Sequence, residues 1–460
     1  MRDLTQGKPV KVIIMFMIPM LIGNLFQQLY STIDMMIIGQ TLGTNALAAI
    51  GATHSIVFLV FGFVIGLTSG LNILTAQNFG ARDMPGVRRS FATGIVIAGI
   101  VTLIVTVAAS IFLRPILDLM RTPPEIIEYA HSFMTVVFYG IVAFVAFQLL
   151  SNTLRAIGDA KTPLYALIVL SLVNIALVYL FVVVLGMGIF SAGLGIILSA
   201  AAGSLFLLIH IHRNVPNLKI NRSDFNLTKH DLWSHAKVAF PMAFQTSIIA
   251  IGTIIIQIAI NTLGTDAVAA NAAGMRIDQL IILPLLSFSI TLSTFTAQNY
   301  GAKKFDRISQ GVKEGMKFGI GFTVLAGLSM ILWGADLAML FFSGDYPNVY
   351  ALLQTYFLIH GATYWLLAMK FMVRSALQGI GKTMIPTIGG VLELIIRVLG
   401  VVLLTAPLGF VGIALVNPLA WVVGSPYLVY HAIKELKKLS KLQKATQTTI
   451  QEESLEMVTE

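Results

Sequence analysis

One carboxylate in a long apolar segment is the residue of this sequence best placed to do chemistry. Asp34 lies near the middle of residues 24–39, where a helix would be mostly apolar. An ionised aspartate at bilayer depth costs about 3 kcal/mol, so such a residue tends to face a water-filled cavity or a partner. The alternative is a carboxylate that braces a neighbouring helix. Helical spacing places further polar side chains on the face of Asp34, and these favour a functional role: Asn24, Gln27, Tyr30 and Ser31.

These polar residues on the face of Asp34 are called the stripe below. The composition predicts that they belong to a membrane protein. Of the 460 residues, 57% are apolar and 11% are charged, whereas soluble domains carry roughly 25% charged residues. Apolar runs of about 20 residues recur along the whole chain, and barrel strands would be about half that length. The predicted fold class is therefore an all-α polytopic membrane protein. The chain has no cysteine, which excludes disulfides and thiolate metal sites.

Twelve transmembrane helices are expected from the apolar runs. The first is interpreted as a retained helix rather than a signal peptide, because its apolar run exceeds the usual length of a signal h-region. The expected spans are 12–38, 46–77, 90–112, 126–152, 163–185, 191–212, 238–262, 267–298, 316–342, 350–376, 386–406 and 410–432.

The distribution of basic residues predicts the orientation of these helices. The net charge is +9, but lysines and arginines concentrate in alternate loops, which favours membrane topology over nucleic-acid binding. The loops of the other side hold only Arg114 and Arg121. We expect a multi-pass plasma-membrane protein with both termini in the cytoplasm. The expected domains are an N-lobe at 1–212, a cytoplasmic linker at 213–237, a C-lobe at 238–433 and a disordered cytoplasmic tail at 434–460.

The two halves of the chain repeat each other. Three blocks recur in the same order, two displaced by 221 residues and one by 223. Because each half would hold six spans, both halves would share one orientation, which implies two six-helix lobes related by a pseudo-two-fold axis along the membrane normal. The paired blocks are TLGTNALAA at 41–49 with TLGTDAVAA at 262–270, TAQNFGA at 75–81 with TAQNYGA at 296–302, and LRAIGDAKTP at 154–163 with LQGIGKTMIP at 377–386.

These blocks, with DMMIIGQTLGTNALAAIG around Asp34, resemble the multidrug and toxic compound extrusion (MATE) family of cation-coupled antiporters. The resemblance covers the chain from Pro19 to about His431. It implies two lobes around a central cavity that opens alternately to each side, and exchange of H⁺ or Na⁺ for organic, often cationic, compounds. Proton or cation coupling is implied for the positions that match the family's first-lobe site: Asp34, Tyr30, Gln27 and Asn174.

Departures from the family pattern bear on the coupling ion. Val178 stands where proton-coupled relatives carry a second aspartate, and Ile249 stands where Na⁺-coupled relatives carry a glutamate. In the expected tenth span, no acid occurs between Ala351 and Arg374. The pattern looks most like the DinF-like branch and favours H⁺ coupling. Na⁺ at Asp34 stays open, because neighbouring neutral oxygens could complete a site; no other metal or cofactor is expected.

Other polar residues in the spans are candidates for the substrate cavity. Arg276 and Asp278 are two residues apart and cannot face each other on a helix, so each needs a partner elsewhere. Lys370 could contact substrate or extend to the inner interface. Glu393 and Arg397, at i and i+4, are expected to pair. The cavity candidates are Asn24, Met35, Asn152, Gln257, Arg276, Asp278 and Tyr364.

The sequence therefore predicts a secondary-active antiporter, acting as a monomer among membrane lipids, that exports amphipathic, cationic organic compounds. Alternatives are a Na⁺-coupled multidrug antiporter and a flippase for a lipid-linked precursor, which would need a cationic cavity. An enzyme is disfavoured because no paired acid and base is evident within the spans. Walker and G-x-G-x-x-G patterns are absent, which removes ATP-driven transport.

Overall fold

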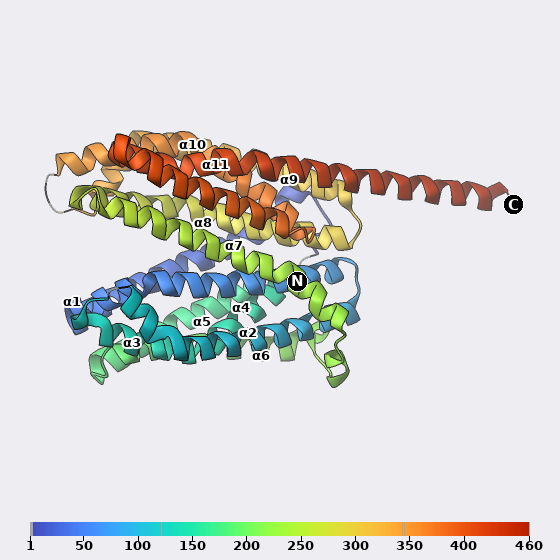
Figure 1. Cartoon of the computed structure of the whole chain (residues 1–460). Helices are drawn as coiled ribbons and strands as arrows, with labels where there is room; N and C mark the ends of the chain where they lie inside the picture. Colours follow the sequence, from blue (N-terminus) through green and yellow to red (C-terminus); the bar gives the residue numbers. More distant parts are fainter. Residues whose placement is uncertain (1–2, 121, 343, 345, 460) are drawn as a thin grey trace. The chain divides into compact units, whose positions relative to one another are not determined.

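The computed structural model describes residues 3–120, 122–342, 344 and 346–444. Every regular element in that part is a helix (Figure 1). The elements are α1 (Pro9–Gly80), α2 (Met84–Leu119), α3 (Pro124–Tyr139), α4 (Ile141–Ala156), α5 (Lys161–Val178), the π-helix η1 (Tyr179–Val184), α6 (Ile189–Asn214), the short η2 (Pro216–Leu218) and η3 (Arg222–Phe225), α7 (Lys229–Asn261), α8 (Thr265–Gly301), α9 (Phe305–Met339), α10 (Pro347–Gly379) and α11 (Met384–Thr459).

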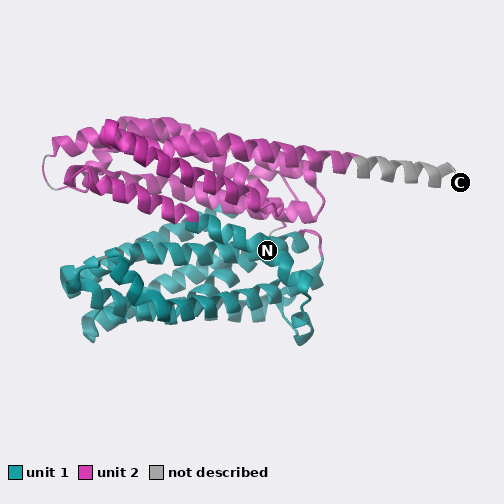
Figure 2. Ribbon diagram, viewed as in Figure 1, with its two compact units in different colours: residues 1–2, 16–79, 83–247 teal, residues 3–15, 80–82, 248–460 magenta. Residues whose placement is uncertain are grey.

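The chain forms two compact units (Figure 2). Unit 1 contains Phe16–Phe79 and Asp83–Ser247, and unit 2 contains Asp3–Met15, Gly80–Arg82 and the chain from Ile248 onward. The lobes expected at 1–212 and 238–433 remain predictions, and the units differ from them in detail. Residues 3–15 pack with unit 2, and residues 238–247 pack with unit 1.

In unit 1, α6 is the helix that packs against α3, α4 and α5. Close approach of α1 and α5 occurs at Gly23, where an added Cβ would lie 3.2 Å from Leu167 Cδ2. A larger residue at Gly23 would therefore require the Leu167 side chain to shift. This contact holds together the two helices that carry Asp34 and Asn174.

In unit 2, α10 packs against α8, α9 and α11. Two glycines allow α9 and α10 to cross closely, since a Cβ on Gly361 would lie 2.7 Å from Gly327 O. Many residues of α10 are buried, among them polar ones such as His360 and Lys370. The middle of unit 2 is thus a helix that needs polar partners on its neighbours.

The backbone repeats where the sequence repeats. Left-handed φ angles occur at matched positions of the two halves, and one matched pair is not glycine: Arg82 has φ 61° and Lys303 has φ 56°. Left-handed φ is uncommon outside glycine, so its recurrence at equivalent turns is strong support for the internal repeat. The glycine pairs are Gly43 (79°) with Gly264 (92°), Gly158 (86°) with Gly381 (81°), and Gly188 (72°) with Gly409 (55°).

Eight described helices are long and apolar enough to cross a membrane, or nine if α3 and α4, bent by 48°, form one span. Two of the eight contain a non-helical residue, Gly43 in α1 and Gly409 in α11. The structure is that of an all-helical, multi-pass membrane protein. The tail expected to be disordered, 434–460, is helical through Lys444 as part of α11, and residues 445–460 lie outside the described residues.

The segment before α1 is bound to unit 2 by several hydrogen bonds. Asn299 Nδ2 donates to Leu4 O at 3.2 Å, Lys304 Nζ donates to Thr5 O at 2.9 Å, and Arg307 Nη1 donates to Gly7 O at 2.8 Å. Burial raises the pKa of Asp3, but hydrogen bonds from Thr5 and Gln6 outweigh it and hold the pKa below its usual value. This segment is therefore anchored to the turn between α8 and α9 in unit 2.

The linker expected at 213–237 packs on unit 1 in a comparable way. Arg89 Nη2 lies 2.8 Å from Asp231 Oδ2 and donates to Asn226 O at 3.2 Å. Arg88 Nε lies 3.6 Å from Asp224 Oδ2. Two arginines at the start of α2 thus hold the linker and the first turn of α7.

Candidate functional site

Asp34 meets Asn174 in the interior of unit 1. Asp34 is 8% exposed and Asn174 is fully buried. When the amide nitrogen of Asn174 faces the carboxylate, it donates to Asp34 Oδ2 at 2.6 Å and Oδ1 at 2.9 Å. The sequence named both residues, and the structure brings them together from α1 and α5.

The amide of Asn174 can serve either protonation state of Asp34. Its nitrogen donates to a carboxylate, whereas its oxygen, turned by 180°, accepts from a carboxylic acid or contacts a cation. The other end of the amide faces Ser199 Oγ at 3.4 Å. In the described part of the chain, Asn174 is the one hydrogen-bond partner recorded for Asp34. Carboxylate lone pairs therefore remain for a proton or another ligand.

The other residues of the stripe differ in exposure. Tyr30 is half-buried and close enough to interact electrostatically with Asp34. Gln27 and Ser31 are exposed, whereas Asn24 and Met35 are half-buried. The stripe thus runs from exposed polar side chains to a buried carboxylate.

Val178 explains why this site holds one acid. It is fully buried, and a Cβ on Gly195 of α6 would lie 2.7 Å from Val178 Cγ2. The position one turn after Asn174 is therefore filled by tight apolar packing. Immediately beyond it, the helix continues as the π-helix Tyr179–Val184.

Unit 2 contains a second buried carboxylate, Asp278, with more partners. Tyr356 Oη donates to Asp278 Oδ2 at 2.7 Å, and His360 Nδ1 lies 3.2 Å from the same oxygen. Tyr364 Oη donates to Oδ1. These three residues share one face of α10, at spacings of four, and meet α8 at Asp278.

Aromatic rings surround His360 in this cluster. The Tyr356 ring stacks on it with centroids 4.0 Å apart, and Trp421 of α11 meets it edge-on at 5.8 Å. The sequence identified Asp278 and Tyr364 as separate candidates, and it missed Tyr356. The spacing of residues 356, 360 and 364 could have suggested a polar face on α10.

Within the described part of the chain, no hydrogen bond or ion pair joins Asn152, Gln257 or Arg276 to Asp34 or Asp278. Asn152 is buried, donates to Thr68 Oγ1 at 3.2 Å, and accepts from Arg155 Nη1 at 3.0 Å. Gln257 is exposed and donates to Asn261 Oδ1 at 2.9 Å. Arg276 is exposed.

Lys370 belongs to a buried ion cluster rather than extending to an interface. Its Nζ lies 2.9 Å from Glu393 Oε2, and Arg397 Nη2 lies 3.6 Å from the same oxygen. The i, i+4 pair of Glu393 and Arg397 is confirmed. Arg397 Nε also donates to Asn417 Oδ1 at 3.1 Å. The cluster thus joins α10 to the residues of α11 that precede Gly409 and to those that follow it.

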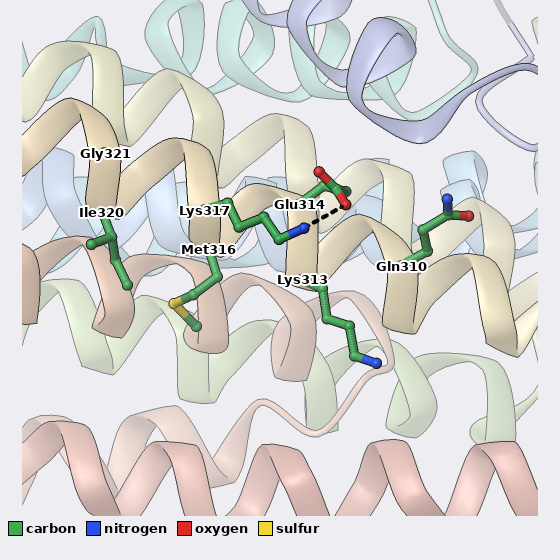
Figure 3. Close-up of a pocket in the computed structure, with 7 residues that line it drawn as sticks. All are labelled: Gln310, Lys313, Glu314, Met316, Lys317, Ile320 and Gly321. Carbon is green, nitrogen blue, oxygen red and sulfur yellow. Dashed lines mark hydrogen bonds and ion pairs between the residues drawn. The ribbon is translucent and has the colours of Figure 1, made fainter.

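A shallow pocket on α9 is shown in Figure 3. Two of the residues that line the pocket form an ion pair, Lys317 Nζ with Glu314 Oε1 at 3.2 Å. The rest of the lining consists of Gln310, Lys313, Met316, Ile320 and Gly321. Neither Asp34 nor Asp278 contributes to it. Groups of three or more metal-binding side chains (His, Cys, Asp or Glu) are not found among the described residues.

Comparison with known proteins identifies the relatives of this chain. A family model described as MatE matches residues 19–180 and 241–403, one copy in each half. The chain is 29% identical over 311 residues to the probable multidrug resistance protein YoeA of Bacillus subtilis, covering 66% of this chain and 67% of that protein. It is 30% identical over 313 residues to the probable multidrug resistance protein YpnP of the same organism, covering 66% and 68%.

Solved structures match the fold over nearly the whole chain. A crystal structure of MATE in the bent conformation superimposes with a TM-score of 0.89, covering 96% of this chain and 98% of that one at 22% identity. At this identity the match establishes the fold alone.

Proposed function

This chain belongs to the MatE family of transporters, the MATE proteins, and is not an enzyme; from that premise we propose that it exports amphipathic, cationic organic compounds in exchange for protons. The pairing of Asp34 with Asn174 is the observation that carries the proposal. The two Bacillus relatives are named probable multidrug resistance proteins, which supports organic drugs as substrates.

In the proposed cycle, a cationic substrate binds beside ionised Asp34, and protonation of Asp34 from outside removes the charge and releases the substrate. The protein then returns inward with the proton, which leaves on the cytoplasmic side. Substrate and proton compete for one carboxylate, and this competition supplies the differential affinity between states that coupled exchange needs. Asn174 supports both states by presenting its nitrogen or its oxygen.

Further features of the transporter are part of the proposal. We assign twelve spans in two six-helix lobes related by a pseudo-two-fold axis, because breaking α1 at Gly43 and α11 at Gly409 and adding α10 to the nine apolar spans gives twelve. The loop charges support a plasma-membrane orientation with both ends of the chain in the cytoplasm. The protein acts as a monomer of the DinF-like branch.

Na⁺ is the competing ion. The residues that would hold it are Asp34, Asn174, Tyr30 and Gln27. The amide of Asn174 would have to turn its oxygen toward the ion. Val178 and Ile249 add no acid, and Na⁺ sites in proteins depend on several oxygen ligands, so H⁺ is favoured. The flippase alternative needs a cationic cavity, and the buried cations Lys370 and Arg397, which share the one carboxylate of Glu393, are the residues on which it would depend.

Transport in proteoliposomes tests the proposal. An outwardly acidic pH gradient without a Na⁺ gradient should drive efflux of a fluorescent organic cation, and a Na⁺ gradient without a pH gradient should not. Efflux that follows Na⁺ alone would make Asp34 a sodium ligand. Efflux driven by neither gradient, from protein that binds the dye, would contradict secondary-active antiport.

A further inference from the structure

An apolar groove lies on unit 1, between α1, α2 and the start of α7. Its cavity volume is about 500 Å³, and ten of its eleven lining residues are apolar. Ile100 and Ile104 of α2 are 54% and 60% exposed, and Trp233 of α7 is 68% exposed. The remaining polar lining residue is Lys229, in the first turn of α7.

The face of α7 that lines the groove changes character along its length. Lys229, Trp233, Ala236 and Phe240 follow one another at spacings of four, three and four, so they share one side of the helix. At 1.5 Å per residue, Lys229 and Phe240 are about 16 Å apart along the axis. Along this face a lysine comes first, then a tryptophan, then an apolar wall. A phospholipid presents its phosphate, its glycerol region and its acyl chain in the same order.

The charge of Lys229 is left for a ligand because the acids near it have other partners. Asp231 is paired with Arg89 at 2.8 Å, and Asp224 lies 3.6 Å from Arg88. Within the described residues, no acid lies at ion-pair distance from Lys229. One uncompensated lysine therefore stands at the end of an apolar groove.

We propose that this groove binds one anionic phospholipid, with an acyl chain between α2 and α7 and the phosphate at Lys229. The groove presents exposed apolar side chains of a helical membrane protein, for which lipid is the surrounding solvent, and the lysine selects the anionic headgroup. The lipid would come from the cytoplasmic leaflet if the proposed orientation of the protein holds. Lipid binding itself requires neither that orientation nor transport activity.

Quenching of Trp233 fluorescence by brominated lipids tests the site. The full-length protein is reconstituted in phosphatidylcholine vesicles that contain a rising fraction of brominated phosphatidylglycerol or brominated phosphatidylcholine. The chain has four tryptophans, so the signal of Trp233 is the difference between the wild type and Trp233→Phe.

Phosphatidylglycerol should quench Trp233 with about fivefold higher apparent affinity than phosphatidylcholine, as expected for one lysine near a lipid surface. Lys229→Gln should remove this preference. Lys219→Gln, the same change at an exposed linker residue outside the groove, should keep it.

Three results would overturn the proposal. Equal quenching by both lipids would mean that the groove does not select a headgroup. Absence of quenching by either lipid would mean that another chain segment or a second copy covers the groove. Equal loss of preference in the Lys219 and Lys229 variants would assign the effect to general surface charge.

Discussion

Asp34 and Asp278, buried carboxylates of the two units, differ in how completely the protein satisfies them. Asp278 receives hydrogen bonds from Tyr356 and Tyr364 and contacts His360, all from one helix. Among the residues that the structure describes, Asp34 has one hydrogen-bond partner, the amide of Asn174. A carboxylate with several donors fixes its neighbours, whereas one with a single reversible partner can exchange ligands. This difference is the basis on which we propose that exchange occurs in unit 1 and that Asp278 braces unit 2.

The largest expected effect is at Asp34. Asp34→Asn keeps the shape and hydrogen-bonding capacity of the side chain but removes proton exchange, so coupled efflux should fall at least about 100-fold, a barrier increase of roughly 3 kcal/mol. Efflux per molecule is measured in proteoliposomes at matched protein content. Asp118→Asn, at an exposed acid of α2, is the control and should transport normally; normal transport by the Asp34 variant would reject the assignment.

Asn174→Ala should have the next largest effect. It leaves the buried carboxylate without its donor, and an unmet partner of this kind costs about 1–3 kcal/mol. Efflux should fall about tenfold and its dependence on pH should shift, while Asn174→Gln should rescue part of the loss. An unchanged pH profile in the alanine variant would separate Asn174 from the exchange step.

Asp278→Asn should change stability more than transport. The amide cannot accept all the bonds from α10, so we expect a loss of about 2 kcal/mol of stability and, in the protein that remains folded, at least half of the wild-type efflux rate. Thermal unfolding in detergent and efflux per folded molecule are measured together. A variant that stays stable and yet fails to transport would place an exchange step in unit 2 and break the comparison.

Tyr356→Phe should have the smallest effect. It removes one donor to Asp278 and leaves His360 and Tyr364 in place, so the expected cost is about 1 kcal/mol of stability with efflux unchanged. A large loss of transport would show that the cluster does more than brace α8 against α10.

Sequence patterns predicted the helical class, the membrane location and the internal repeat, because apolar length and repeated turn residues are local signals. The left-handed backbone at Arg82 and Lys303 was not predicted, since neither residue type favours it. Asp34 and Asn174 could be paired only through the family resemblance, because they are far apart in the sequence. The cluster around Asp278 joins α8 to α10, and such a contact depends on packing that periodicity does not specify.

The most direct test counts the protons released when substrate binds. Organic cation is added to the purified protein in weakly buffered detergent solution, and released protons are followed with a pH indicator over a series of starting pH values. The account predicts about one proton per bound cation for the wild type and for Asp278→Asn, and none for Asp34→Asn. Release by the Asp34 variant at the wild-type level, or its loss in the Asp278 variant alone, would contradict the assignment of exchange to Asp34.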